Sequence, residues 1–550
     1  MNGPPPASPN AARGPRKNKP VSAPWMNTWI EKPVIPGIRH LPGSGFWALL
    51  AGKGLDALSS KSNYQFVEKE LRPYCCDGKV ATFYAGRTPV VYVPNGVDMN
   101  VLSREIRNYS QKKQFGASGQ FVGPRNIIQL EMSADDKRSR HSYGDAARAI
   151  TSTTNNKHAM ADFYRGITED IEKMVGLEVS ESSEKGFSLD QFTHVLAMDL
   201  GAKLLMGAEK CRPSELIREN PDYLDLIKEF TSRLAFSGDG ITNYILRSVG
   251  LKKSHVDLKK EEAQFSEYVI ALLEKNFPDI CDKRNLPLQM KWKTKDFFGD
   301  KSNEDELFEF PRSWEEFKAF PKGKSAAVQE KYRDLLIDQA FLQIVSSETT
   351  AQAMNFGTRE LLNNPDSMLT IRKEVEDLAH HGMTLEDVQP KDMSRLLPEL
   401  SCFVMETLRL YTPAPLIAWT VKKDTTAFIE GESRVLKKGT TLLFDQEMAN
   451  QLAFPDGHEF RPGRWTERPG FDFETALDDL KKGSDDFRTF AGGPRVCPGR
   501  TMAAMEVAKL LAVFSRYDLS STETCSMSRS GREALRPDQD LHLQLVSAQA

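Results

Sequence analysis

The chain has 550 residues, of which 73 are basic and 76 acidic, so its formal net charge at pH 7 is −3. This near balance excludes a strongly basic chain that neutralises nucleic-acid phosphates over its whole surface, and nucleic acid is not an expected partner. With 40% hydrophobic and 27% charged residues, the composition is typical of a soluble globular protein. At about 150 residues per domain, the length predicts three to four domains or one large enzyme domain.

The first 30 residues contain no acidic residue and combine four basic residues with seven prolines. So many prolines exclude a long amphipathic helix, and we expect residues 1–30 to form a disordered basic arm. Organelle-targeting segments are also basic and poor in acidic residues, so delivery to an organelle stays open. The best early apolar run, Phe46–Ala51, is far shorter than the roughly 20 residues of a transmembrane helix. We therefore expect no transmembrane helix, and either a cytoplasmic location or peripheral membrane contact through nearby aromatic residues.

The next segments predict a β-hairpin followed by a mainly helical chain. Residues 79–93 contain two β-branched and aromatic runs joined at Ala85-Gly86-Arg87, which is typical of a hairpin. Beyond them, apolar residues recur at spacings of three and four, which predicts helices. These helices are expected over residues 138–151, 194–205, 264–275, 332–362, 366–379, 397–410 and 501–515.

Two further segments interrupt this helical pattern. Residues 291–329 are rich in charges, glycine and proline, which predicts a solvated loop or insertion. Residues 420–444 predict short strands, with Gly431 and Gly439 at the turns. We see no internal repeat and no linker long enough to require separate domains.

Seven cysteines are spread along the chain without the repeated C-x-x-C spacing of a structural zinc site. A disulfide scaffold is not expected in a chain of this size. A cysteine with a special role would therefore act alone.

Cys497 is the candidate for such a role. Residues 490–500 read FAGGPRVCPGR and directly precede the predicted helix 501–515, so the sulfur lies in a tight loop beside a helix N-terminus. Free N–H groups and the helix dipole lower the pKa of a thiol there, and a thiolate can bind a metal or a haem iron. Gly493 and Gly499 allow the backbone to approach the sulfur, and Arg495 can bind a carboxylate such as a haem propionate. An inert core thiol is the alternative.

This loop resembles the haem-binding loop of the cytochrome P-450 family, F-x-x-G-x-R-x-C-x-G. Its five specified positions are filled by Phe490, Gly493, Arg495, Cys497 and Gly499. A chance match somewhere in the chain has a probability on the order of 10⁻⁴, so the pattern disfavours an inert thiol. The resemblance implies a haem b cofactor, with Cys497 as the axial thiolate and metal ligand.

Two upstream segments resemble the family as well. Glu406 and Arg409 match E-x-x-R, whose spacing places both side chains on one helix face. Arg464, in the sequence FRPGRW, matches the arginine of the family segment F-x-P-x-R-[FW]. The resemblance implies that these three residues form a buried triad, which supports the haem loop rather than the chemistry.

Residues 345–350 read VSSETT and resemble the oxygen-binding stretch [AG]-G-x-[DE]-T-[TS]. The resemblance implies that Glu348 and Thr349 are catalytic and deliver protons to bound dioxygen. An exposed helical pair is the alternative reading. The chain departs from the family at Val345 and Ser346, which replace small residues that leave room over the haem, and at Trp419, where an arginine is often found.

Residues 136–141 read DKRSRH, in a region where family members usually hold a haem propionate with a tryptophan or histidine followed by an arginine. Arg138 and His141 are the candidates for this role. Solvent-facing side chains, or a docking face for an electron donor, are the alternatives.

The resemblance implies a mainly α fold with small β-sheets (α+β), in which residues 31–550 form one haem domain after the arm. It implies a monooxygenase that inserts one atom of O2 into a lipophilic organic substrate, such as a steroid, terpenoid, fatty acid or other secondary metabolite. We find no flavin, iron–sulfur or dinucleotide-binding motif, which implies a separate NAD(P)H-dependent reductase. A haem-thiolate isomerase, dehydratase or peroxide-using enzyme without a reductase, and a non-catalytic haem-binding protein, stay open.

Overall fold

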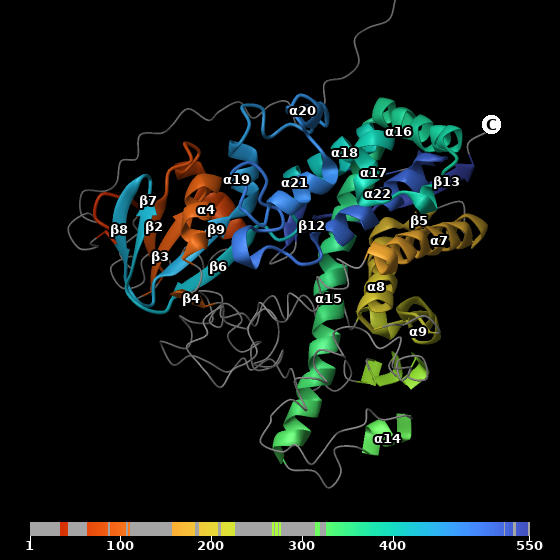
Figure 1. Cartoon of the computed structure of the whole chain (residues 1–550), viewed down its shortest axis with the longest axis horizontal. Coiled ribbons are helices and arrows are strands. Elements are labelled where there is room, and N and C mark those ends of the chain that lie inside the picture. The colour runs from red at the N-terminus through yellow and green to blue at the C-terminus, as the bar shows by residue number, and fades with distance from the viewer. Residues whose placement is uncertain are drawn as a thin grey trace, which may run out of the picture.

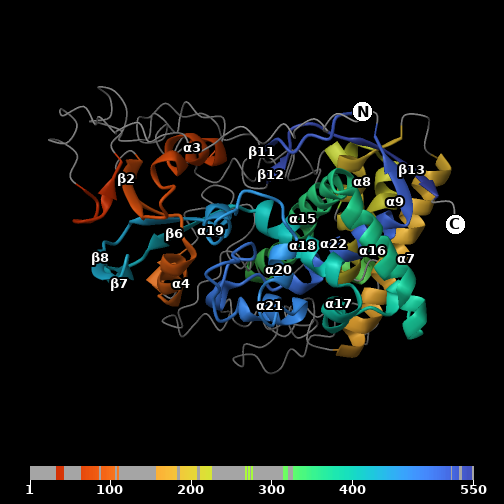
Figure 2. The same ribbon diagram turned by 90° about the horizontal axis from the view of Figure 1, so that it is seen from above.

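A β-rich lobe and a larger helical body lie side by side in both views of the computed structural model (Figures 1 and 2). The long helix α15 (Ala326–Asn363) runs through the helical body. The expected mainly α fold with small sheets is confirmed. The structure describes residues 33–41, 63–85, 88–105, 108–110, 157–181, 186–206, 211–225, 267–268, 270–272, 274–276, 314–319, 326–521, 523–531 and 535–547.

The β lobe is built on a six-stranded sheet of order β1-β2-β3-β9-β6-β4. Ala85 of β2 pairs with Thr88 of β3 in antiparallel register, which confirms the predicted hairpin. Val90 of β3 pairs in parallel register with Thr441 of β9, so segments far apart in the sequence share this sheet. Its strands are β1 (Arg39–His40), β2 (Ala81–Ala85), β3 (Thr88–Val93), β4 (Tyr109–Ser110), β6 (Leu416–Val421) and β9 (Thr441–Asp445).

The short strands predicted over residues 420–444 are also confirmed. Glu430 and Gly431 connect β7 and β8 with φ angles of 52° and 76°, and Gly439 has a φ of 89°, conformations that favour glycine. The small sheets contain β7 (Thr425–Ile429) with β8 (Glu432–Leu436), β11 (Arg529–Gly531) with β12 (Leu535–Pro537), and β10 (Tyr517–Ser520) with β13 (His542–Ser547) and β5 (Phe187–Ser188).

The helices predicted over 194–205, 332–362, 366–379, 397–410 and 501–515 are confirmed to within a few residues, except that α15 and α8 begin five or six residues earlier. Residues 264–275 are helical where they are described, and the helix predicted over 138–151 lies outside the described residues. The helices are α3 (Asn63–Glu70), α4 (Gly96–Arg104), α7 (Lys157–Glu181), α8 (Leu189–Met206), α9 (Pro213–Glu219), α14 (Trp314–Ala319), α15, α16 (Pro365–Asp377), α17 (Pro390–Leu396), α18 (Pro398–Leu410), α19 (Gln446–Leu452), α20 (Gly463–Thr466), α21 (Phe473–Asp479) and α22 (Arg500–Ser515), with short 3₁₀ turns η2 (Arg72–Tyr74), η5 (Leu378–His381), η6 (Leu385–Asp387) and η7 (Gly493–Arg495).

The core of the helical body lies where α15, α18 and α22 meet. Every residue from Leu400 to Leu410 of α18 is buried, as expected for a helix surrounded by protein. A Cβ atom on Gly357 of α15 would lie 3.2 Å from Leu511 of α22 and 3.5 Å from Thr407 of α18. This close approach fixes α15 against the helix that follows Cys497.

A buried ionic cluster joins the β lobe to later parts of the chain. Arg72 donates from Nε to Asp445 Oδ2 at 2.7 Å and from Nη2 to Glu447 Oε2 at 2.8 Å. Tyr92 OH donates to Asp445, and Arg529 forms an ion pair with Glu447. Both carboxylates are fully buried. Burial alone would raise the pKa of Glu447, but the charges of Arg529 and Arg72 hold it below its ordinary value.

The N-terminal predictions concern residues that the structure leaves mostly undescribed. The predicted arm, residues 1–30, and the apolar run Phe46–Ala51 lie outside the described residues. Of the predicted insertion at 291–329, the structure describes α14 and the first residues of α15. Within the described part of the chain, no helix combines the length and apolar character needed to cross a bilayer.

Candidate functional site

Cys497 lies in a closed loop between η7 and α22. Its backbone N–H donates to the carbonyl oxygen of Phe490 at 2.9 Å, which joins the two ends of the loop. Gly493 has a φ of 66°, in the left-handed region that favours glycine. A Cβ atom on Gly492 would lie 2.5 Å from Nη1 of the buried Arg488. Glycine at both positions is therefore needed for this loop shape, and the role of Gly492 was not predicted.

Desolvation dominates the electrostatics of the Cys497 thiol. Burial raises its pKa, while the backbone N–H of Gly499 and the charge of Arg500 offset the rise only in part. The expectation that the helix N-terminus would lower this pKa is wrong, because the loss of water outweighs the nearby N–H group. A cation held against the sulfur would favour the thiolate form. A Cβ atom on Gly499 would lie 4.0 Å from Sγ, an ordinary contact, so the approach of this backbone to the sulfur does not by itself require glycine.

Two residues of the loop, Phe490 and Arg495, contact aromatic side chains. Phe490 packs against the main core and lies edge-on to Phe487, with the ring centroids 6.2 Å apart. The guanidinium carbon of Arg495 lies 5.3 Å from the ring centroid of Trp419, a cation–π contact. Trp419 is 4% exposed and belongs to β6. The tryptophan found in place of an arginine therefore contacts Arg495 and supplies no second cation.

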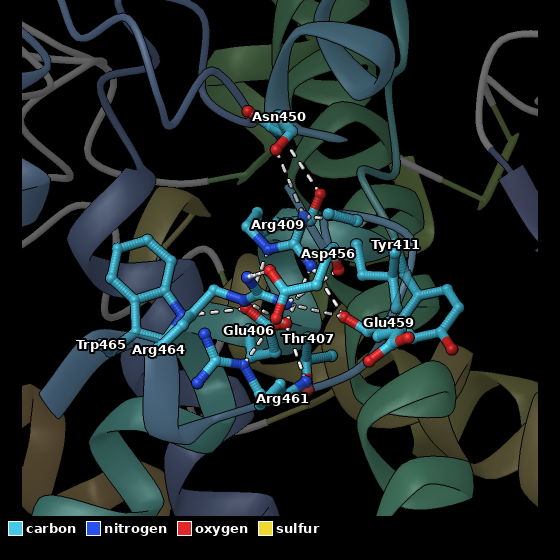
Figure 3. A network of polar contacts seen from close by, with 12 residues as sticks. Glu406, Thr407, Arg409, Tyr411, Asn450, Asp456, Glu459, Arg461, Arg464 and Trp465 are labelled. Carbon is cyan, nitrogen blue, oxygen red and sulfur yellow. Dashed lines mark hydrogen bonds and ion pairs between the residues drawn. The ribbon is translucent and has the colours of Figure 1, made fainter. Parts of the chain in front are cut away.

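The predicted triad residues are brought together in one buried network (Figure 3). Glu406 accepts hydrogen bonds from Arg409 Nε and Nη2, both at 2.8 Å, and from Arg464 Nε at 2.9 Å. It also accepts from Trp465 Nε1 at 3.0 Å and from the Arg461 backbone N–H at 2.9 Å. Five donors therefore surround one fully buried carboxylate.

A second carboxylate balances the charge of this network. Asp456 Oδ1 accepts from Arg464 Nη1 at 2.5 Å, and this hydrogen bond holds the pKa of Asp456 below its usual value. Arg409 donates its remaining hydrogen bonds to backbone carbonyls, including that of Gly457 at 2.7 Å. The Arg461 guanidinium also pairs with Asp456 and with Glu467, so three guanidinium groups meet three carboxylates. The absence of net charge offsets part of the cost of burying Arg409 and Arg464. Asp456 was not predicted, because it lies between the E-x-x-R and F-x-P-x-R-[FW] segments and neither family pattern includes an acid there.

Asn450 connects the triad to the loop of Cys497. The Asn450 carbonyl accepts from Arg409 Nη1 at 3.2 Å, and the Asn450 side-chain amide donates to Thr489 Oγ1 at 3.0 Å. Its Oδ1 accepts the backbone N–H of Arg488 at 2.5 Å. Thr489 also donates to the carbonyl of Leu408 in α18 at 2.7 Å. The triad therefore holds the chain immediately before Phe490.

Glu348 and Thr349 are neighbours on α15, and their side chains form hydrogen bonds with different partners. Thr349 Oγ1 donates to the carbonyl of Val345 at 3.2 Å, one turn earlier in the same helix. Glu348 Oε2 lies 3.1 Å from Nε2 of His194, in α8. The Glu348 side chain is only 14% exposed, so the reading of an exposed helical pair is wrong for this residue. His194 was not predicted, and no local sequence pattern marks it as the partner of Glu348.

The predicted propionate partners Arg138 and His141 lie outside the described residues. Their role stays a prediction.

Glu506, on α22, is a buried acid that was not predicted. It is 1% exposed, and its Oε1 has no hydrogen-bond partner among the described residues. Burial raises the pKa of Glu506 to about 8. A carboxyl with a raised pKa favours folding below pH 4.5, its ordinary pKa, and this contribution is lost as the pH rises to about 8.

We expect Glu506→Gln to remove this pH dependence. The variant should be more stable than the parent at pH 8, by on the order of 3 kcal/mol, and should match it near pH 5. Urea unfolding at the two pH values measures the difference. Glu376→Gln, at an exposed position of α16, is the control and should leave the pH dependence intact. Equal effects of Glu506→Gln at pH 5 and pH 8 would contradict the prediction.

Comparison with known proteins gives a family match in the part of the chain that holds these residues. Residues 330–543 match the family model described as "Cytochrome P450". "Cytochrome P450 52-M1" of Starmerella bombicola is 32% identical over 197 residues, which are 33% of this chain and 34% of that protein. "Cytochrome P450 52A10" of Candida maltosa is 26% identical over 372 residues, 61% of this chain and 66% of that protein. The chain thus spans about a third of the first relative's length and about two thirds of the second's.

A solved structure matches a larger part of the chain. The crystal structure of the "cytochrome P450DA heme domain" superposes with a TM-score of 0.63 at 14% identity, over 92% of this chain and 97% of that one. At this identity the likeness concerns the fold. The region matched by the family model includes Glu348, the triad and the loop of Cys497.

Proposed function

We propose that the chain is a haem-thiolate monooxygenase of the cytochrome P450 family, whose model matches residues 330–543. It inserts one oxygen atom from O2 into a lipophilic organic substrate, with electrons from a separate NAD(P)H-dependent reductase. We assign residues 31–550 to the haem domain. The relatives match over part of their length only.

Members of this family bind haem through a cysteine thiolate. In this chain Cys497 would be the axial ligand of haem b, with Phe490, Gly493 and Gly499 shaping the loop around it. Arg495, held by Trp419, would bind a propionate, and Arg138 and His141 are further candidates. Bound haem would supply the activation of dioxygen and the oxygen-insertion chemistry.

The other residues have supporting roles in this proposal. Glu406, Arg409 and Arg464 hold the chain that precedes the loop, through Asn450. The Thr349 hydroxyl donates to the Val345 carbonyl and can exchange that hydrogen bond for one to a water molecule. Glu348, the residue before Thr349, is the acid that would supply protons to the reaction. Val345, one turn before Thr349, has 37% of its surface exposed and presents an apolar side chain there, which supports a lipophilic substrate.

The observation that carries the proposal is the connection between the Cys497 loop and a charge-neutral buried network. An inert core thiol would not need a loop closed by glycines and supported by two buried arginines, because their burial costs free energy. The test has two parts. The haem-loaded protein should show the red-shifted Soret band of the reduced carbon monoxide adduct, and product formation should require NADPH, a reductase and O2.

Other outcomes would overturn the proposal. Failure of the haem-loaded protein to show the shifted band would exclude thiolate ligation. Product formation with peroxide alone would support the peroxide-using alternative. A screen of steroids, terpenoids and fatty acids for spectral displacement of the iron-bound water would identify the substrate class.

We expect Trp419→Leu to weaken haem retention without changing the iron ligand. Loss of the cation–π contact, about 0.5–2 kcal/mol, should raise the haem dissociation rate by a factor of roughly 2 to 30. Haem transfer to excess apomyoglobin measures this rate, and the carbon monoxide band should stay in place. Trp419→Phe keeps an aromatic face and should lose haem more slowly than Trp419→Leu. Equal rates for the parent and Trp419→Leu would show that Trp419 does not position Arg495.

A further inference from the structure

His194 is buried between two acids at the contact of α8 with α15. Its side chain is 5% exposed, and its Nε2 lies 3.1 Å from Glu348 Oε2. Its Nδ1 lies 2.7 Å from the carbonyl oxygen of Asp190 and 3.3 Å from Asp190 Oδ1. Both ring nitrogens therefore face acceptors, an arrangement that favours the doubly protonated imidazolium.

Gln352 closes the cluster on the α15 side. It lies one turn after Glu348 and is fully buried. Its Nε2 donates to Glu348 Oε1 at 3.4 Å and lies 3.3 Å from His194 Nε2, which as an imidazolium nitrogen does not accept a hydrogen bond from it. The Asp190 side chain, 24% exposed, is the most accessible member of the cluster, compared with 14% for Glu348.

The surrounding charges leave His194 as the only cation in direct contact with Glu348 among the described residues. Arg536, in β12, favours the charged form of Glu348 from farther away. Asp540 accepts a hydrogen bond from the Asp190 backbone N–H. Other charged groups on and just after α8 have partners of their own. Lys203 and Arg212 pair with Asp170 of α7, and Asp199 accepts hydrogen bonds from Ser214.

The two acids determine where the proton of the cluster resides. Burial lowers the pKa of His194, but Glu348 and Asp190 outweigh it and raise the pKa to about 10. Burial raises the pKa of Glu348, and His194 outweighs that effect, so that this pKa falls below its usual value. At neutral pH the proton therefore lies on the ring, and Glu348 is a carboxylate.

We propose that His194 is a positioning residue for Glu348, which it holds as a carboxylate turned toward α8 and supplies with the proton that the reaction consumes. In that step the N–H bond at Nε2 breaks and an O–H bond forms at Glu348 Oε2, which leaves a neutral imidazole whose Nδ1–H still faces Asp190. Glu348 then gives up that proton to the reaction and returns to a carboxylate, and a hydronium ion from the solvent reprotonates Nε2 and restores the imidazolium. The inference rests on the proposed function, because it gives Glu348 a partner for proton delivery. If the role were only structural, the ion pair of His194 with Glu348 would do no more than stabilise the contact between α8 and α15.

The first test measures the ionisation of His194 without any turnover. Histidine labelled with ¹³C at Cε1 should give one NMR signal that keeps its imidazolium position to at least pH 9. This signal should be absent from His194→Gln, and in Glu348→Gln it should titrate at least two pH units lower. A His194 signal that titrates near pH 6.5 in the parent would overturn the proposal.

The second test uses the haem-loaded protein with a reductase, NADPH and O2 as the probe. His194→Gln should lower the rate of NADPH oxidation by about tenfold and increase its solvent deuterium isotope effect, since a positioned acid typically contributes at least this factor. The matched control is Lys203→Gln, which breaks another ion pair of α8, that with Asp170. It should reduce stability without changing the isotope effect.

The outcomes separate the inference from the proposed function. If His194→Gln and Lys203→Gln lose similar stability and neither changes the rate or the isotope effect, the ion pair only stabilises the contact between the two helices and the inference fails. If the parent shows neither the carbon monoxide band nor NADPH oxidation, the proposed function fails. In that case the NMR titration still decides whether His194 holds Glu348 in its ionised form.

Discussion

Replacing Cys497 with alanine is expected to abolish the red-shifted Soret band of the reduced carbon monoxide adduct. In the proposed site the sulfur is the only protein ligand of the iron, and alanine has no donor atom to replace it. The fold should survive, because Cys497 lies in a loop and is only partly buried. The hydrogen bond from its backbone N–H to Phe490 does not depend on the side chain. Difference spectra of the reduced protein, with and without carbon monoxide, measure the effect.

Cys525→Ser provides the matched control for this experiment. Cys525 is also partly buried, and its Sγ contacts the carbonyl oxygen of Arg359 at 3.6 Å. The control should keep the shifted band at full intensity. A shifted band that persists in Cys497→Ala would contradict the ligand assignment, as would its loss in Cys525→Ser alone.

Replacing Glu406 with alanine is expected to destabilise the fold by about 3–5 kcal/mol, the typical cost of removing one partner from a buried ion pair. The change leaves Arg409 and Arg464 buried with only Asp456 as a countercharge. It also leaves the indole N–H of Trp465 without its acceptor. Because the network reaches Thr489 through Asn450, haem incorporation should fall together with stability.

Urea unfolding and the haem content of the purified protein measure the two effects of this change. Glu399→Ala, in the same helix, removes a carboxylate whose side chain accepts a hydrogen bond from Ser367, and should cost much less. If Glu406→Ala does not fold, Glu406→Gln keeps the shape and part of the hydrogen bonding, and should be intermediate. Equal costs for Glu399→Ala and Glu406→Gln would contradict the importance of the buried charge.

The elements with strong local signals could be predicted from the sequence. The apolar period of α15, α16, α18 and α22 gave their bounds to within a few residues, except for the start of α15, and β-branched runs gave the hairpin β2–β3. The segment FAGGPRVCPGR indicated the loop of Cys497. The matched segments around Glu406 and Arg464 indicated the three residues that the structure brings into contact.

The contacts that depend on packing between distant helices could not be predicted in the same way. His194 lies 154 positions before Glu348, and only the packing of α8 on α15 makes them neighbours. The pKa of the Cys497 thiol was predicted in the wrong direction, because a helix N-terminus is visible in the sequence whereas desolvation depends on the surrounding fold. Asp456 was not predicted for a similar reason, since its role depends on the position that the fold gives to the Arg464 guanidinium group.

The parallel pairing of β3 with β9 has a consequence for the synthesis of the chain. Tyr92 and its partner Asp445 are 353 positions apart, so a ribosome adding roughly 5–20 residues per second makes the second residue about 20–70 s after the first. Throughout that interval the β2–β3 hairpin has an unpaired edge that can template aggregation. The hairpin is therefore without its partner strand during most of the synthesis of the chain, and we expect chaperones that bind the nascent chain to increase the yield of this protein.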